Sequence, residues 1–175
     1  MTSNRMPSNN KGFSLIEVLV TLIIVSIGIM GLISMQLISA KNVNNAELRS
    51  LASYYVYDMV ERMRANPAAV AAGSYNNVNG SETDPGTDCS GGCSFAILAQ
   101  YDAFIWNDMI DNSFANNSPS TPNSPTSARG LGPGAAGEVS LAAGIYTVAV
   151  TWKEQDRNNA GGNITDQTLS IEFQL

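Results

Sequence analysis

Glu17 is the residue whose type and position most strongly suggest chemistry. It is the only charged residue between Phe13 and Ala40, in a segment that is otherwise uncharged and mostly apolar. A carboxylate inside hydrocarbon costs about 3 kcal/mol or more, and such residues commonly have a functional partner. The alternative is that Glu17 lies near a helix end and reaches the lipid headgroups. Its position therefore predicts either a charge partner in an apolar environment or a place at the edge of one.

The sequence lacks most of the residues and motifs on which enzyme catalysis depends. There is no histidine, which removes the commonest general base near neutral pH and the commonest metal ligand. We also find no nucleophile–base pair, phosphate-binding loop or metal-ligand cluster, so we expect no enzyme, no catalytic residue, no metal site and no cofactor. The formal net charge of −6 argues against nucleic acid as a main partner, because phosphate binding needs clustered Lys and Arg.

The apolar segment is long enough to cross a membrane once. No charged residue occurs from Val18 to Ala40, and a spanning helix needs about 20 residues. Residues 1–12 carry Arg5 and Lys11 but no acid, which predicts that they stay cytoplasmic while the remainder faces the periplasm or its equivalent. The segment is too long for an ordinary cleaved signal peptide, whereas a plain single-pass anchor is an alternative.

The string Lys11-Gly12-Phe13-Ser14-Leu15-Ile16-Glu17-Val18-Leu19-Val20 closely resembles the class III signal of type IV pilins and pseudopilins. In that family a prepilin peptidase cuts after the glycine and methylates the new N-terminal amine. The resemblance implies a cleaved leader of residues 1–12, a cleavage site between Gly12 and Phe13, and N-methylation of Phe13. Glu17 matches the family's glutamate, which implies a role in assembly and subunit register.

The chemistry of this junction is consistent with that implication. Cleavage would leave an amine at the positive end of the helix dipole, which is unfavourable. A neighbouring subunit's Glu17 can neutralise that amine in an apolar filament core. Because an unpaired buried carboxylate is costly, such a pair fixes register more than it adds stability. The polar leader would block this packing, so we expect cleavage to be required for assembly.

A long helix must carry these residues. Beyond Ala40, one amphipathic face continues at three- and four-residue steps through Leu48, Ala52, Tyr55, Met59 and Met63. Asn66-Pro67 is a stop signal, because the residue before proline is pushed out of helical geometry. We predict a helix over residues 13–66. About 13–38 would lie in the membrane or filament core, with soft points at Gly28 and Gly31, and the second half would pack on the head.

Residues 67–175 are predicted to form a small extracytoplasmic head. We expect residues 68–94 to be a loop, 94–110 an amphipathic helix with Trp106 as a packing anchor, and 112–137 a low-complexity flexible loop. Residues 145–152 and 164–175 should be paired strands, with a short extra strand around 138–141. The fold class is therefore α+β and type IV pilin-like: a long N-terminal α-helix, transmembrane in its N-terminal half, packed on a small antiparallel β-sheet head.

Cys89 and Cys93 are the two cysteines, separated by three residues. A head facing an oxidising compartment favours a disulfide, and so short a span should stabilise by less than the usual value of about 2–4 kcal/mol. Zinc is disfavoured without further Cys or His, and a redox motif normally has two intervening residues. Calcium at Asp84–Asp88 or Asp156–Asn159 is a weaker alternative than turn chemistry, because neither stretch has calcium-loop spacing.

Three segments narrow the resemblance to PilV-type minor pilins: Glu61–Pro67, the cysteines before a Tyr101-Asp102…Trp106 helix, and the late Tyr146–Trp152 strand. The resemblance implies a minor type IV pilin that helps to prime or tip the pilus, and hence serves adhesion, twitching motility or DNA uptake. Its partners would be prepilin peptidase, other major and minor pilins and the assembly platform of the inner membrane. It would lie in the inner membrane before assembly and on the cell surface afterwards.

Two alternatives to a minor pilin are open. One is a pseudopilin of a type II secretion or competence system, which shares the architecture. The other belongs to a different class, a membrane-anchored periplasmic binding module that never assembles. The Gly12-Phe13 junction and Glu17 are the features that favour an assembling subunit.

Overall fold

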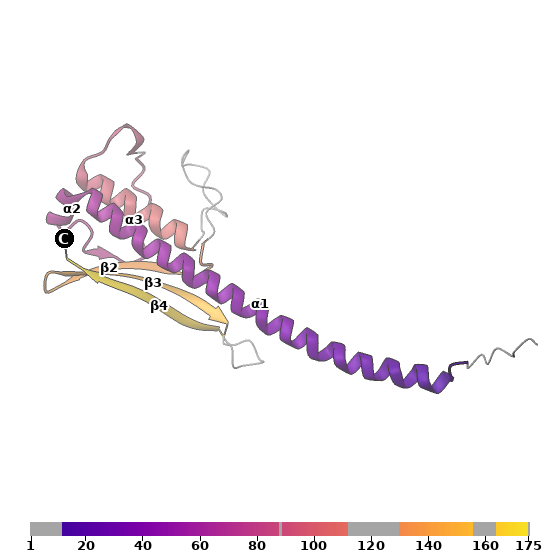
Figure 1. Cartoon of the computed structure of the whole chain (residues 1–175). Helices are drawn as coiled ribbons and strands as arrows, with labels where there is room; N and C mark the ends of the chain where they lie inside the picture. Colours follow the sequence, from indigo (N-terminus) through magenta and orange to yellow (C-terminus); the bar gives the residue numbers. More distant parts are fainter. Residues whose placement is uncertain (1–11, 88, 112–129, 156–163, 175) are drawn as a thin grey trace, which may run out of the picture. The chain divides into compact units, whose positions relative to one another are not determined.

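The structure, a computed structural model, describes residues 12–87, 89–111, 130–155 and 164–174. Its elements are α1 (Leu15–Ala65), α2 (Pro67–Ala71), β1 (Asn77–Val78), the 3₁₀ turn η1 (Cys89–Gly91), α3 (Phe95–Asp111), β2 (Ala136–Ala142), β3 (Ile145–Gln155) and β4 (Ile164–Phe173) (Figure 1). The chain divides into two compact units, Met1–Ala40 and Lys41–Leu175. From here on, the head means this second unit, which includes the second half of α1 as well as residues 67–175.

The first unit contains the apolar half of α1. Its large apolar side chains are exposed from Leu15 to Ile38, and α1 is long and apolar enough to cross a membrane by length and composition. The hydroxyls of Thr21, Ser26 and Ser34 donate to backbone carbonyls three or four residues earlier, at 2.7–3.0 Å. Since these hydroxyls are satisfied within the helix, they do not oppose an apolar surrounding.

The head contains a four-stranded antiparallel sheet with strand order β1-β2-β3-β4. β3 alternates between its two faces, and the side chains that it buries are Tyr146, Val148, Val150, Trp152 and Glu154. The predicted strand pair is thus present. β2 begins at Ala136, so the extra strand is longer than predicted and starts inside the segment expected to be a loop. Residues 112–129 of that expected loop lie outside the described residues.

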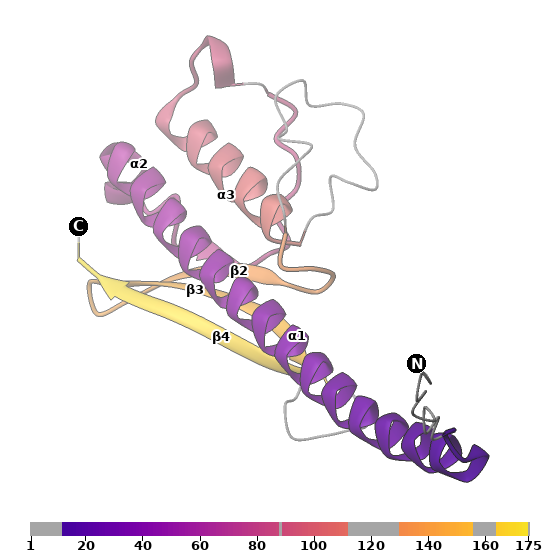
Figure 2. The same cartoon turned by 45° about the vertical axis from the view of Figure 1, so that its right-hand side comes forward.

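The second half of α1 and α3 lie over the same face of the sheet (Figure 2). The predicted helical stripe is confirmed, because Ala52, Tyr55, Met59 and Met63 are buried and Leu48 packs against their cluster. The sheet contributes to the same core, as does α3, with its fully buried residues Trp106 and Ile110. The predicted α+β fold, a long helix packed on a small antiparallel sheet, is therefore confirmed.

The expectation of a plain loop over residues 68–94 is wrong. The segment contains most of α2, the short strand β1 and the turn η1. Pro67 ends α1 as predicted but is also the first residue of α2. Proline fits the first position of a helix, because its fixed φ suits a helix start and its missing N–H would be unpaired there anyway. The residue that stops one helix therefore starts the next.

Candidate processing and assembly site

The Gly12-Phe13 junction lies just before the first turn of α1. Gly12, Phe13 and Ser14 are not helical and are exposed, and nothing lies within 4 Å of where a Cβ on Gly12 would be. Phe13 projects a large apolar side chain outward. A peptidase needs backbone that is accessible and free of secondary structure. The described part of the chain therefore presents this peptide bond in a form that a peptidase could bind.

Glu17 occupies the first turn of the same helix. The Ser14 carbonyl accepts from the N–H of Glu17 at 3.0 Å and of Val18 at 3.3 Å. Ser14 is therefore the N-cap, and Glu17 is the third helical residue, so the pair has the spacing of a capping box. A carboxylate here lies beside unpaired N–H groups and the positive end of the helix dipole. This capping pattern can be read from the sequence, but it was missed there.

The head is held together by a polar network at the end of α1. Arg62 donates from Nε to Asp58 Oδ2 at 2.8 Å and from a terminal nitrogen to Asp102 Oδ1 at 3.0 Å. The Tyr75 hydroxyl donates to the other Asp102 oxygen at 2.8 Å. Burial, and then the Asp102 carboxylate, raise the pKa of Tyr75. Burial alone would lower the pKa of Arg62, but Asp58 and Asp102 outweigh it and raise that pKa.

Asn66 extends this network to the start of α3. Its amide donates to the Phe95 carbonyl at 2.9 Å and lies 3.4 Å from the Tyr75 hydroxyl. The segments Glu61–Pro67 and Tyr101–Trp106, singled out separately in the sequence, thus meet through Arg62 and Asp102. The network positions elements and exposes no nucleophile, so its role is structural. Sequence spacing alone could not pair residues forty positions apart.

A second ion pair joins α1 to β3, farther toward the N-terminus of α1 than Arg62. Arg49 contacts both carboxylate oxygens of Glu154, at 2.9 and 3.0 Å. Glu154 is only 4% exposed and also accepts from the Trp152 indole at 3.1 Å. Nearby, the buried Asn45 amide donates to the Gln155 carbonyl at 3.1 Å. The bonds from Arg49 and Trp152 satisfy the carboxylate of Glu154, which β3 directs toward the core.

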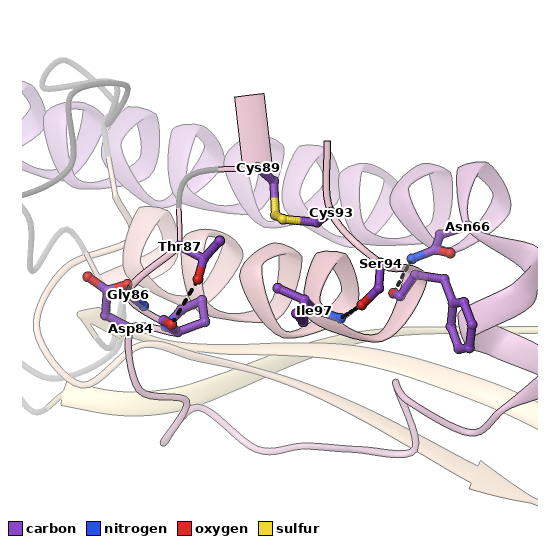
Figure 3. Close-up of a disulfide and its surroundings, with 10 residues drawn as sticks. Asn66, Asp84, Gly86, Thr87, Cys89, Cys93, Ser94 and Ile97 are labelled. Carbon is purple, nitrogen blue, oxygen red and sulfur yellow. Dashed lines mark hydrogen bonds between the residues drawn. A yellow bond between two sulfur atoms is a disulfide. The ribbon is translucent and has the colours of Figure 1, made fainter. Parts of the chain in front are cut away.

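Cys89 and Cys93 form the predicted disulfide, with Cα atoms 5.2 Å apart (Figure 3). It closes the turn directly before α3, where Ser94 Oγ accepts from the Ile97 N–H at 3.4 Å. At Asp84 the carboxylate accepts from the Gly86 N–H at 2.8 Å, which is a turn contact, and Asp88, the other end of this calcium candidate, lies outside the described residues. The other calcium candidate, from 156 to 159, lies outside the described residues. The described residues contain no group of three or more Asp, Glu, His or Cys that could hold a metal.

A helix that joins an exposed apolar segment to a sheet-bearing head is the architecture of a membrane-anchored, pilin-like subunit. Comparison with known families matches residues 7–33 to the prokaryotic N-terminal methylation motif and residues 34–104 to type IV pilin Tt1218. These adjoining matches cover more than half of the 175 residues. The chain belongs to the type IV pilin family. Members of that family are structural subunits, so the chain is not an enzyme.

The first match includes Gly12, Phe13 and Glu17, and the motif implies processing by prepilin peptidase and assembly with other pilins. Comparisons with curated proteins and with solved structures gave no match.

Proposed function

We propose that this chain is a minor type IV pilin, processed at Gly12-Phe13 and built into a filament through α1. Its leader, residues 1–12, is removed, and the new N-terminal Phe13 is methylated. Residues 13–66 then form the long helix, with about 13–38 in the membrane or filament core, and residues 67–175 form the extracytoplasmic part. The observation that carries the proposal is the exposed, non-helical junction directly before the apolar part of α1, residues 15–40, whose one carboxylate is Glu17.

Glu17 is proposed to pair with the amine of Phe13 on a neighbouring subunit. Residues 13–40 contain no Lys or Arg, so after cleavage that amine is the only cation in the apolar segment. Glu17 is four residues after Phe13 of its own chain. A carboxylate and an amine that both leave water need each other, because either one alone is costly in an apolar environment. The pair would set how far one helix is shifted along the next.

The minor-pilin assignment is supported by the head. Two of the three segments by which it resembles PilV-type minor pilins, Glu61–Pro67 and the Tyr101–Trp106 helix, meet in one network around Asp102, whereas the Tyr146–Trp152 strand lies outside it. We place the protein in the inner membrane with its head in the periplasm, and then in the pilus at the cell surface. Its proposed partners are prepilin peptidase, major and other minor pilins, and the assembly platform. Together they would serve adhesion, twitching motility or DNA uptake.

N-terminal mass analysis of protein from sheared filaments tests the proposal. We expect a chain that begins at Phe13 and carries one added methyl group.

Gly12→Leu should abolish processing, because a bulky side chain would enter the peptidase's glycine position. A mature chain of normal mass from Gly12→Leu would refute the cleavage site. Wild-type protein that stays in the membrane fraction would favour the non-assembling binding module, and dependence on a secretion platform would favour the pseudopilin.

Glu17→Ala separates processing from assembly. We expect processing to continue while the amount in sheared filaments falls by about tenfold or more, because a buried amine loses its partner. Glu61→Ala is the matched control, since Glu61 lies on the same helix but forms only an exposed pair with Arg64. Equal incorporation of both variants would remove the proposed role of Glu17.

A further inference from the structure

The hairpin between β2 and β3 ends in five consecutive exposed apolar residues. Leu141 is 40% and Ile145 is 39% exposed, and Ala142, Ala143 and Gly144 between them are exposed as well. Single exposed apolar side chains are ordinary on protein surfaces. An uninterrupted exposed run at a turn, where polar residues are expected, is unusual unless it has a function. These five residues are called the hairpin tip.

The turn itself also breaks a local rule. Ala143 has a φ of 51° and Gly144 a φ of 81°, so both residues are left-handed, as a type I′ turn requires. Such turns favour Asn-Gly or Asp-Gly, because Asn and Asp tolerate this conformation better than Ala. Because Ala143 is exposed, its side chain gains no buried contact with the described part of the head that would offset this strain. A local rule broken without a structural gain points to a function at that place.

Tyr146, the next residue in the chain, anchors the hairpin tip to the rest of the head. The Tyr146 hydroxyl, one residue beyond the tip, lies 3.2 Å from the Val70 carbonyl and 3.0 Å from Asn76 Oδ1, two acceptors that share its single proton. The Tyr146 ring stacks on Phe173 with centroids 5.9 Å apart. The tip therefore lies at the end of the head that carries α2 and the end of β4 (Figures 1 and 2). In α2, Ala68 and Ala71 are exposed too.

We propose that the hairpin tip docks against the head of a neighbouring pilin subunit, which rests on the proposed function. The chain has a net charge of −6, yet no charged residue lies between Glu138 and Lys153. The five residues of the tip carry no charge, so acidic subunits can approach closely at the tip itself, while the exposed Glu172 of β4 lies beside Thr147 at its rim. The depletion of charge at its centre is also typical of protein interfaces. A membrane is a poorer occupant, since the tip has no exposed Trp, Tyr, Lys or Arg to anchor it.

A charge placed on the tip should block incorporation. We expect Ile145→Glu to lower the amount of full-length chain in sheared filaments by about tenfold, because the contact would bury an unpaired carboxylate. Ile164→Glu is the matched control, as Ile164 is 63% exposed in the same sheet but lies outside the tip. Thermal unfolding of both purified full-length variants in detergent should match the wild type. Equal incorporation of the two variants would overturn the proposal.

Ala143→Asn distinguishes a turn that docks from a turn with only a structural role, because the two roles predict different changes in incorporation. Asparagine relieves the left-handed strain, so Tm should rise by about 3 °C, while the added polar amide should reduce incorporation severalfold. A turn with only a structural role would raise or preserve incorporation together with Tm. That outcome would contradict docking even if Ile145→Glu proved to be poorly folded.

A photo-crosslinking amino acid at position 143 identifies the occupant. In filaments it should form adducts with a pilin-family chain identified by mass spectrometry, whereas the same group at position 164 should not. Adducts with lipid, or with proteins outside the pilin family, would overturn the assignment. If the wild type is absent from sheared filaments, the proposed function fails and the docking proposal fails with it. If the wild type is present and tip variants behave like the control, the docking proposal alone is wrong.

Discussion

At the scale of single residues, Gly137 allows a tryptophan to lie directly on the backbone of β2. A Cβ at this position would overlap the Trp106 ring and come within 2.8 Å of Ile110 Cδ1. Trp106 is fully buried, and its indole donates to the Tyr55 carbonyl of α1 at 2.8 Å. The Gly137 N–H in turn donates to Asn107 Oδ1 at 2.7 Å. The absent side chain therefore brings β2, α3 and α1 together at one point.

Gly137→Ala should destabilise the head by about 1–3 kcal/mol, because the added methyl overfills a closely packed site and the large ring cannot move aside. Urea unfolding of the full-length protein in detergent, followed by tryptophan fluorescence, measures this. Gly91→Ala is the control, since nothing lies within 4 Å of its Cβ position and its φ is not left-handed. A free energy of unfolding equal to that of the control would show that the contact at Gly137 is loose.

At the scale of elements, α3 is held by a disulfide just before its start and by Asp102 near its middle. The disulfide between Cys89 and Cys93 closes a span of only five residues, so it restricts the unfolded chain little. Asp102, by contrast, joins Arg62 of α1 to Tyr75 across long stretches of sequence, and its side chain is 11% exposed. A mostly buried carboxylate with two partners should therefore contribute more to the docking of α3 than the disulfide does.

Asp102→Asn should lower the free energy of unfolding by about 2–4 kcal/mol, because Arg62 and Tyr75 both lose a charged acceptor. Replacing both cysteines by serine should cost less than about 2 kcal/mol. Denaturant unfolding of the two variants under the same conditions compares them directly. A larger loss from the cysteine variant would reverse this order and make the disulfide the main fastening of α3.

Sequence patterns predicted what depends on local spacing. The stripe from Leu48 to Met63 and the stop at Asn66-Pro67 placed the end of the long helix to within one residue, because helix periodicity and proline act locally. Its start, predicted at Phe13, lies two residues later at Leu15. Proline's second role, as the first residue of α2, was missed, since a stop and a start look alike in sequence. The Gly137 contact and the Arg62–Asp102 pair were also missed, because both depend on how distant elements pack.

At the scale of the whole molecule, three tyrosines make the head sensitive to alkali. Burial raises the pKa of Tyr55, Tyr75 and Tyr146; Tyr54 and then Asp58 add to this effect at Tyr55, and Asp102 adds to it at Tyr75. An unfolded tyrosine ionises near pH 10, at about the usual value. Because the folded pKa values lie higher, the folded head binds more protons above that pH. Its stability is therefore fully present below about pH 10 and falls as the pH rises through the folded pKa values.

We expect the free energy of unfolding to be flat between about pH 8 and pH 10 with respect to these tyrosines, and to fall above pH 10. Tyr75→Phe should lower stability at pH 8 by about 1–2 kcal/mol, through the lost bond to Asp102, yet make the alkaline decline shallower. Tyr57→Phe is the control, since Tyr57 is exposed on α1. Urea unfolding at several pH values measures the slopes. Of the three tyrosines, Tyr75 is the one whose pKa is raised by both burial and a direct bond to Asp102. If the free energy of unfolding fell equally steeply with pH in wild type and Tyr75→Phe, other groups would cause the alkaline loss.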